Sequence, residues 1–192
     1  MFVTVSGPPG SGKSTTAAAL ADAFDIEHVS GGDIFREMAA EHDMTPVEFN
    51  EYAEQEPDID RDLDERLHDI AVQRDNLVLE SRLSGWLAGD HADFRVWLDA
   101  PLPVRARRIA SRENKSVELA REETQRREAS EAKRYLEFYD IPIDNLAIYD
   151  LVYNTARWSK EGIQDLLVST LRAYEEEGDE GKHPITGVSY DF

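Results

Sequence analysis

Gly7-Pro8-Pro9-Gly10-Ser11-Gly12-Lys13-Ser14-Thr15 fits G-x-x-x-x-G-K-[ST], the pattern of a phosphate-binding P-loop. The apolar, β-branched run at 1–6 predicts a buried strand before it, and the Ala-rich segment 15–24 predicts a helix after it. In that context the glycines let the backbone curl around an anion, and the helix dipole adds partial positive charge. The Lys13 ammonium can then reach the β- and γ-phosphates of a nucleotide, and the Ser14 hydroxyl can bind Mg²⁺ directly. An ordinary glycine-rich turn is the alternative that this context disfavours.

The composition indicates an acidic, single-domain protein of 192 residues. Asp and Glu number 40 against 21 Lys and Arg, a formal net charge of −19, which argues against a nucleic acid or an anionic membrane as the main partner. This carboxylate excess with few lysines is typical of proteins from salt-loving organisms, and an acidic mesophilic protein is the alternative. The absence of cysteine excludes disulfides and thiolate metal sites. Because the chain begins in a core strand and has no apolar run of membrane length, we expect a cytoplasmic monomer acting on small molecules.

Short apolar runs alternate with helical patterns, which predicts an α/β fold of the P-loop NTPase type, with a five-stranded, mostly parallel sheet and helices on both faces. The expected strands cover residues 1–6, 26–29, 76–80, 93–99 and 150–154. The segment 31–74 is too long for a plain crossover, so it predicts a small helical insert over one side of the site. We expect one domain at 1–176 and a flexible acidic tail at 177–192.

Arginines crowd the regions that would surround the P-loop. Glu80 ends the third strand and is followed by Ser81 and Arg82, at the sheet edge where such folds bind ligands. Two predicted helices carry a further set: Arg105, Arg107, Arg108, Arg112, Arg121, Arg126, Arg127 and Arg134. On so acidic a chain this set predicts a multivalent phosphate ligand, although helix-surface ion pairs explain some members, such as Arg107 and Arg121. The chain has no Asn/Thr-Lys-x-Asp motif for guanine, which disfavours a GTPase.

Seven short motifs occur along the chain: Gly7–Thr15, Ser30–Met38, Glu56–Arg61, Leu79–Trp86, Arg108–Arg112, Arg126–Tyr135 and Ile148–Val152. With them the chain resembles the nucleoside monophosphate kinases, and most closely the short archaeal type of cytidylate kinase. The first motif is diagnostic only of a P-loop, whereas the run Arg-Arg-Glu-Ala-Ser-Glu-Ala-Lys-Arg-Tyr at 126–135 is much more specific. The resemblance covers about residues 1–172, and it departs at Ser81, where relatives usually have Gly.

The resemblance implies a kinase that uses ATP and Mg²⁺ to phosphorylate CMP or dCMP. It places ATP on the P-loop residues 7–15, with Arg108 against the base or ribose, and a Mg²⁺-bound water on Glu80 or Asp33. It assigns the migrating phosphoryl to Lys13, Arg112, Arg127 and Arg134, the arginines coming from a short lid region at about 112–127. The acceptor phosphate is already a nucleophile, so no general base is needed, and the lid closes to exclude water.

On the acceptor side, the resemblance implies that Arg36 from the insert binds the CMP α-phosphate, with Arg82 helping across the cleft. The implied substrate-binding set is Asp33, Arg36, Arg61 and Arg82. Asp58, Asp60 and Arg61 are candidates for binding the cytosine edge, with capping of the next helix as the alternative. Two other functions stay open: a kinase for another acceptor, such as AMP, UMP or shikimate, and a regulatory module that binds nucleotide without turnover.

Overall fold

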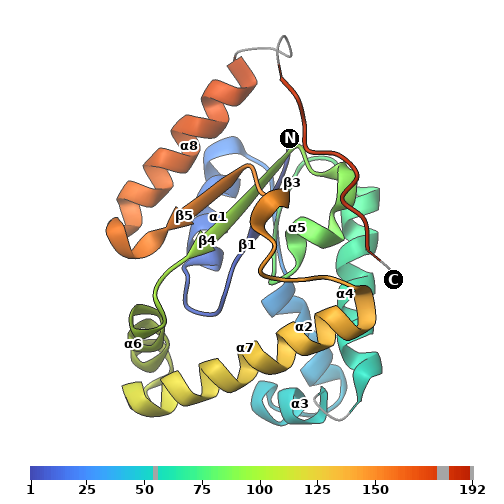
Figure 1. Cartoon of the computed structure of the whole chain (residues 1–192), viewed down its shortest axis with the longest axis vertical. Coiled ribbons are helices and arrows are strands. Elements are labelled where there is room, and N and C mark those ends of the chain that lie inside the picture. Colours follow the sequence, from blue (N-terminus) through green and yellow to red (C-terminus); the bar gives the residue numbers. More distant parts are fainter. Residues whose placement is uncertain (54–55, 177–181, 191–192) are drawn as a thin grey trace.

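A five-stranded parallel sheet lies between helices on both of its faces (Figure 1). The computed structural model describes residues 1–53, 56–176 and 182–190. The strands are β1 (Phe2–Ser6), β2 (Glu27–Ser30), β3 (Leu77–Glu80), β4 (Phe94–Asp99) and β5 (Leu151–Asn154), in the order β2-β3-β1-β4-β5. All four pairings are parallel, which confirms the predicted α/β fold, and each strand lies within one residue of its predicted bounds.

The core explains why these strands are apolar throughout. Successive side chains of β1 point to opposite faces of the sheet, and both faces are covered. Val3 and Val5 pack with Leu20 of α1 (Lys13–Phe24) and Leu167 of α8 (Lys160–Glu176). Phe2 instead joins the second core cluster, on the opposite face. The P-loop is therefore held between a buried central strand and a helix that packs against the sheet.

The segment 31–74 forms a helical insert, as expected. It consists of α2 (Gly31–Glu41), α3 (Pro46–Ala53) and α4 (Pro57–Gln73). A capping box begins α3, because Thr45 N donates to Glu48 Oε2 at 2.9 Å and Glu48 N donates to Thr45 Oγ1 at 3.3 Å. Met38, Phe49 and Ile59 belong to a small core of the insert's own. The last helix begins four residues before the predicted start at 61, because Pro57 at its first turn suits a helix N-terminus.

Two consecutive helices lie in the lower part of the molecule in Figure 1. The first, α6 (Leu102–Glu113), is followed by α7 (Val117–Tyr139), and Asn114 in the left-handed conformation ends α6. The second runs from α6 across to α4 of the insert (Figure 1). Short helices not predicted from the sequence complete the fold: α5 (Ser84–Leu87), η1 (Gly89–His91), η2 (Leu146–Ile148) and η3 (Thr155–Arg157). None of the helices in the described residues has the length and apolar character needed to cross a bilayer.

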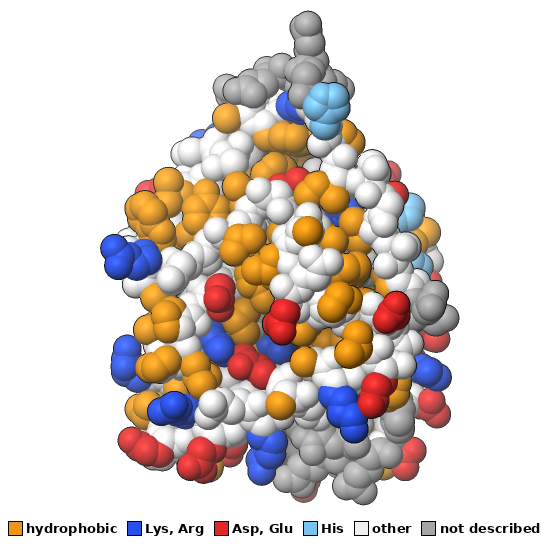
Figure 2. All heavy atoms as spheres, in the orientation of Figure 1, with side chains coloured by type: hydrophobic (Ala, Val, Ile, Leu, Met, Phe, Trp, Pro, Cys, Tyr) orange, Lys and Arg blue, Asp and Glu red, His pale blue; other side chains and the backbone are white. Residues whose placement is uncertain are grey.

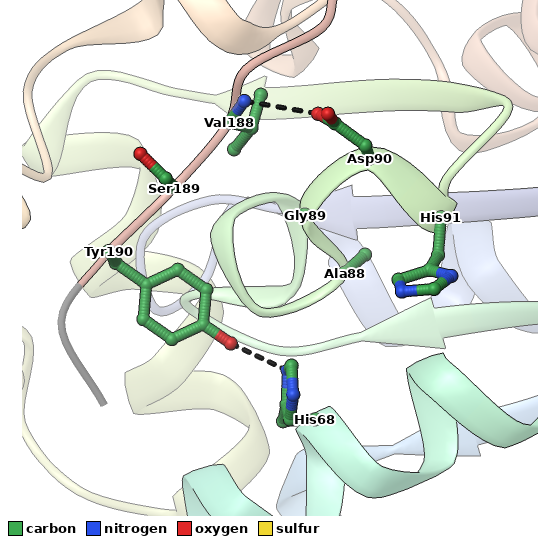
Figure 3. A pocket seen from close by; sticks show the side chains of 8 residues that line it. All are labelled: His68, Ala88, Gly89, Asp90, His91, Val188, Ser189 and Tyr190. Atoms are coloured by element: carbon green, nitrogen blue, oxygen red, sulfur yellow. Dashed lines mark hydrogen bonds between the residues drawn. The ribbon is translucent and has the colours of Figure 1, made fainter.

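The described part of the expected tail, residues 182–190, lies against the folded chain. The Asp90 carboxylate accepts hydrogen bonds from Gly187 N and Val188 N, both at 3.1 Å, and Val188 is buried. The Tyr190 hydroxyl lies 2.7 Å from His68 Nδ1 of α4 (Figure 3). Residues 182–190 of the expected flexible tail therefore contact η1 and α4, whereas residues 177–181 and 191–192 lie outside the described residues.

Candidate active site

The P-loop lies between the end of β4 and the start of α6. A Cβ built on Gly7, at φ +144°, would lie 2.0 Å from Leu98 O, so only glycine fits there. A Cβ on Gly10, at φ +77°, would lie 2.9 Å from Arg105 O. Lys13 opens α1, and its Nζ donates to Pro8 O at 3.2 Å. The predicted phosphate-binding residues 7–15 thus form a loop at 7–12 and the first turn of α1, with the Lys13 side chain folded back onto the loop.

Lys13 lies among charged groups from two other elements. Burial lowers the pKa of Lys13 to about 8, with Glu80 and Glu131 opposing the shift and Arg82 and Arg127 adding to it. Glu80 ends β3, Arg82 follows it, and Arg127 and Glu131 come from α7. The charges of two further predicted site residues, Arg82 and Arg127, therefore act at the position of Lys13. A phosphate placed there would favour the charged form of the lysine.

Glu80 and Ser14 form a pair of oxygen donors beside the P-loop. The Ser14 hydroxyl donates to Glu80 Oε1 at 3.1 Å, and His28 Nε2 lies 3.8 Å from Glu80 Oε2. Burial alone would raise the pKa of Glu80, but the neighbouring His28, Ser30 and Ser14 and the charge of Lys13 together lower it. A buried, ionised carboxylate next to a hydroxyl is a donor set that suits Mg²⁺. The residues present therefore fit the metal that the P-loop implies.

A row of alternating charges joins the end of β3 to α7. Arg82 pairs with Glu131 of α7 through Nη2, and its Nη1 lies 3.9 Å from Glu128 Oε1. Arg127 Nε donates to Glu131 Oε1 at 2.6 Å, and Glu131 is only 4% exposed. The sequence analysis missed both glutamates, although the Arg127–Glu131 spacing of four residues on a helix could have indicated a pair. Figure 2 shows acidic and basic side chains next to one another over α6 and α7, below a largely hydrophobic area.

Arg108 links the P-loop to the segment after β5. Its Nη1 donates to Gly10 O at 3.1 Å and to Thr155 Oγ1 at 2.9 Å, and its Nη2 donates to Thr155 O at 3.1 Å. The Thr155 hydroxyl in turn donates to Ser11 O at 2.7 Å. Burial lowers the pKa of Arg108. The sequence analysis did not identify Thr155, because its contact with the P-loop arises only when β5 is placed beside β4.

Other predicted residues lie apart from Lys13. Arg36 is 59% exposed and pairs with Asp33, one turn before it, while Arg112 is 66% exposed and pairs with Glu113. The Arg61 guanidinium lies 5.5 Å from the ring centre of Phe138. Within the described residues, no ion pair or hydrogen bond joins any of these arginines to the group around Lys13.

The predicted catalytic residue Arg134 lies at the interface between the insert and α7. Arg134 pairs with Asp60 of α4, so it lies between the insert and α7. Burial raises the pKa of Asp60, and Arg134 opposes that shift.

The Ser81 hydroxyl accepts a hydrogen bond from Leu83 N at 3.1 Å, and a Cβ on Gly31 would lie 2.9 Å from Ser81 Cβ. The departure at Ser81 is thus accommodated by glycine at the start of α2.

Comparisons with known proteins place this geometry in a family. The family model of the "Cytidylate kinase-like family" matches residues 2–157. "Cytidylate kinase" of Halorubrum lacusprofundi is 69% identical, and that of Haloquadratum walsbyi is 61% identical, each over 192 residues and all of both chains. "Cytidylate kinase" of Archaeoglobus fulgidus is 43% identical over 171 residues, 89% of this chain and 94% of its own. Halophilic archaea are among the sources, which agrees with the acidic composition.

Solved structures share the fold at low sequence identity. Shikimate kinase from Acinetobacter baumannii, in complex with shikimate, superimposes with a TM-score of 0.59 at 15% identity, covering 92% of this chain and 94% of that one. Shikimate kinase from Bacteroides thetaiotaomicron gives a TM-score of 0.60 at 16% identity, covering 90% and 98%. At such identity the likeness concerns the P-loop kinase fold alone. The sequence relatives carry the assignment: this chain belongs to the cytidylate kinase-like family.

Proposed function

We propose that this enzyme transfers the γ-phosphoryl group of ATP to CMP, and to dCMP, forming CDP or dCDP. The observation that carries the proposal is the shared charge environment of three predicted site residues: Arg82 and Arg127 both pair with Glu131, and their charges lower the pKa of Lys13. Three cations from separate elements that share one charge environment suit a group with several phosphate oxygens. Relatives named cytidylate kinase support CMP as the acceptor.

The donor side is assigned to the P-loop. Its backbone amides and Lys13 bind the ATP phosphates, and Arg108, which already contacts Gly10 O and Thr155, lies against the base or ribose. Ser14 would hold Mg²⁺ directly and Glu80 through a water, as their 3.1 Å contact allows. When bound, the metal neutralises charge on the β- and γ-phosphate oxygens.

The transfer step needs positioning and charge. The acceptor phosphate is a dianion and needs no base, so the chain's task is to align two anions and balance the charge that develops. Lys13, Arg127, Arg134 and Arg112 serve that task. Arg127 and Arg82 both pair with Glu131 in the structure, so they are already oriented before a phosphate takes over those contacts. The turn between α6 and α7, with Asn114 at φ +52°, is the proposed hinge of the lid.

The acceptor is assigned to the insert. Arg36 binds the α-phosphate after exchanging Asp33 for it, and Arg82 approaches from β3. Asp60 and Arg61 both contact α7, since Asp60 pairs with Arg134 and Arg61 lies over the ring of Phe138. This position between insert and lid suits groups that would bind the cytosine edge. We further propose a cytoplasmic monomer whose partners are small molecules.

An acceptor panel tests the function. ADP release from ATP and Mg²⁺ is coupled to a spectroscopic readout with CMP, dCMP, UMP, AMP, GMP or shikimate at equal concentration, in high-salt buffer. We expect CMP and dCMP to give the highest kcat/KM and shikimate to give none. Preference for another acceptor would overturn the acceptor assignment. ATP binding without ADP formation in the presence of any of these acceptors would favour the regulatory module instead.

A further inference from the structure

Arg105 is a buried arginine to which none of these roles applies. Its side chain is 8% exposed, and its guanidinium contacts three separate parts of the chain. Nε donates to Ala100 O at 2.7 Å after β4, and Nη1 donates to Pro9 O at 3.2 Å in the P-loop. Both terminal nitrogens donate to the carboxylate of Glu128 on α7, Nη2 at 3.3 Å. Because a buried charge is tolerated only when it is paired and hydrogen-bonded, this guanidinium has a defined place between the P-loop and α7.

The P-loop side of this junction is tightly packed. A Cβ on Gly10 would lie 2.9 Å from Arg105 O and 3.1 Å from Arg105 Cα, so the two backbones are in contact. One turn further along α6, Arg108 donates to Gly10 O. Two arginines of one helix therefore hold the same loop, and the position of the Arg105 guanidinium follows the position of the P-loop.

On the other side, Glu128 belongs to the helical turn that carries the proposed catalytic groups. It directly follows Arg127, and Glu131 lies three residues later on the same helix face. Its Oε1 also lies 3.9 Å from Arg82 Nη1. The Arg105–Glu128 contact therefore restrains α7 next to Arg127, whose charge acts on Lys13.

We infer that Arg105 and Glu128 are positioning residues for phosphoryl transfer. The pair sets the placement of α7 on the P-loop, so that Arg127 and Arg82 are aligned with the donor phosphates held by that loop. This inference rests on the proposed function. An ion pair that only stabilised the fold would affect unfolding but not the rate of a folded enzyme, and that difference is measurable.

The test uses three variants of the full chain: Arg105→Met, Glu128→Gln and the double variant. Each single change leaves one buried group without its charged partner, so both the melting temperature and kcat should fall. In the double variant both charges are gone and the volumes are similar, so the melting temperature should return close to that of the wild type. We expect its kcat to stay at least about tenfold lower, because misplaced catalytic groups lower the rate even in a folded enzyme. The KM for ATP should change less than kcat.

Two outcomes would overturn the inference. One is a double variant with wild-type melting temperature and a kcat within about twofold of wild type. The second outcome applies if the double variant does not fold. Glu128→Gln alone keeps an acceptor for Arg105, and a folded Glu128→Gln variant with an unchanged kcat would contradict the positioning role. The matched controls are Arg107→Met and Glu137→Gln, exposed residues of the same two helices, for which we expect no loss.

The acceptor panel keeps this test separate from the test of function. Wild-type turnover with CMP in the same assay decides the proposed function by itself. If the wild type preferred another acceptor, the ratio of variant to wild-type kcat with that acceptor would still decide whether Arg105 and Glu128 position α7.

Discussion

The donor side and the acceptor side of the site differ in how far they are already assembled. On the donor side, Lys13, Ser14 and Arg108 each bond to a fixed group of the P-loop, β3 or the segment after β5. On the acceptor side, Arg36 is 59% exposed and pairs with a neighbour on its own helix, and Arg112 of the lid does the same at 66% exposure. The donor half is thus held by backbone contacts, whereas the acceptor half depends on movement of the insert and the lid.

This difference has a physical reason. The P-loop motif is a continuous stretch of chain that joins a buried strand to the first turn of a helix, so its geometry is set by local bonds and by the core. The acceptor groups come from helices that have a small core of their own, and surface ion pairs within a helix are weak, worth about 0.3–0.5 kcal/mol. Arg36 can leave Asp33 at little cost when a phosphate arrives. Removal of a residue on either side should therefore have different kinetic consequences.

Lys13→Ala should have the largest effect, because it removes the one ammonium of the preassembled half. We expect kcat to fall by about 100-fold to 1000-fold, typical of losing a charge-stabilising contact to the transition state. The fold should survive, since the P-loop turns are set by glycines and backbone hydrogen bonds. Steady-state turnover and a thermal melt measure both properties. A variant that keeps more than about a tenth of wild-type turnover would rule out the assigned role.

Arg36→Ala should affect only the mobile half. Loss of a charge-assisted bond to the acceptor dianion should cost about 2–4 kcal/mol, so kcat/KM for CMP falls by roughly two orders of magnitude. The KM for ATP should barely change, because no donor contact is lost. Arg66→Ala is the matched control, an insert arginine that pairs with Asp62 and Glu41 on the surface. An ATP constant that rose as much as the CMP constant would place Arg36 in the donor site or in the fold.

The sequence was sufficient where structure is determined locally. The strands, the P-loop, the insert and the long helix from 117 could be predicted because each depends on the pattern of neighbouring residues. Glu128, Glu131 and Thr155 could not be assigned, because their partners are distant in the chain and meet them only once the helices and strands are packed. Arg105 resembled its exposed neighbours in sequence, although in the structure it is the buried one.

The same limit applies to the contacts of the tail. Residues 182–190 carry few apolar side chains, so their composition predicts a flexible segment. Val188 and Tyr190 nevertheless find places on the surface formed by α4 and η1, which no local pattern indicates. Contacts between distant segments are therefore the part of this molecule that the structure adds.

The pH dependence of the donor half should show the lowered pKa of Lys13. In the free enzyme Lys13 loses its charge as pH rises through about 8. We expect kcat/KM for ATP to fall by about tenfold per pH unit above that value, because a neutral amine does not pair with phosphate. At saturating ATP the bound phosphates favour the ammonium, so kcat should hold to higher pH. A kcat/KM that stayed level to about pH 10 would contradict this interpretation.

Asp64 gives the insert a titrating group of the opposite kind. It lies buried on α4, and burial raises its pKa to about 8, with Asp60 and Glu131 adding to the shift and Tyr139 and Arg134 opposing it. The Tyr190 phenol also faces Asp64. The folded protein therefore keeps a proton that the unfolded chain, with a carboxyl pKa of 3.8, has released. Between those two values stability should fall with rising pH, by up to about 1.4 kcal/mol per unit from this group.

Asp64→Asn should remove that slope, because an amide keeps the shape of the protonated carboxyl and does not titrate. We expect the melting temperature of the variant to exceed that of the wild type by several degrees at pH 8 and by much less at pH 5. Asp62→Asn, at an exposed position of the same helix, is the matched control and should give a pH-independent difference. An Asp64→Asn gain of equal size at both pH values would show that Asp64 is ionised in the folded protein. In the Asp64→Asn variant, kcat/KM for ATP should keep the pH dependence that comes from Lys13. That result would separate the titration of the donor half from the titration of the insert.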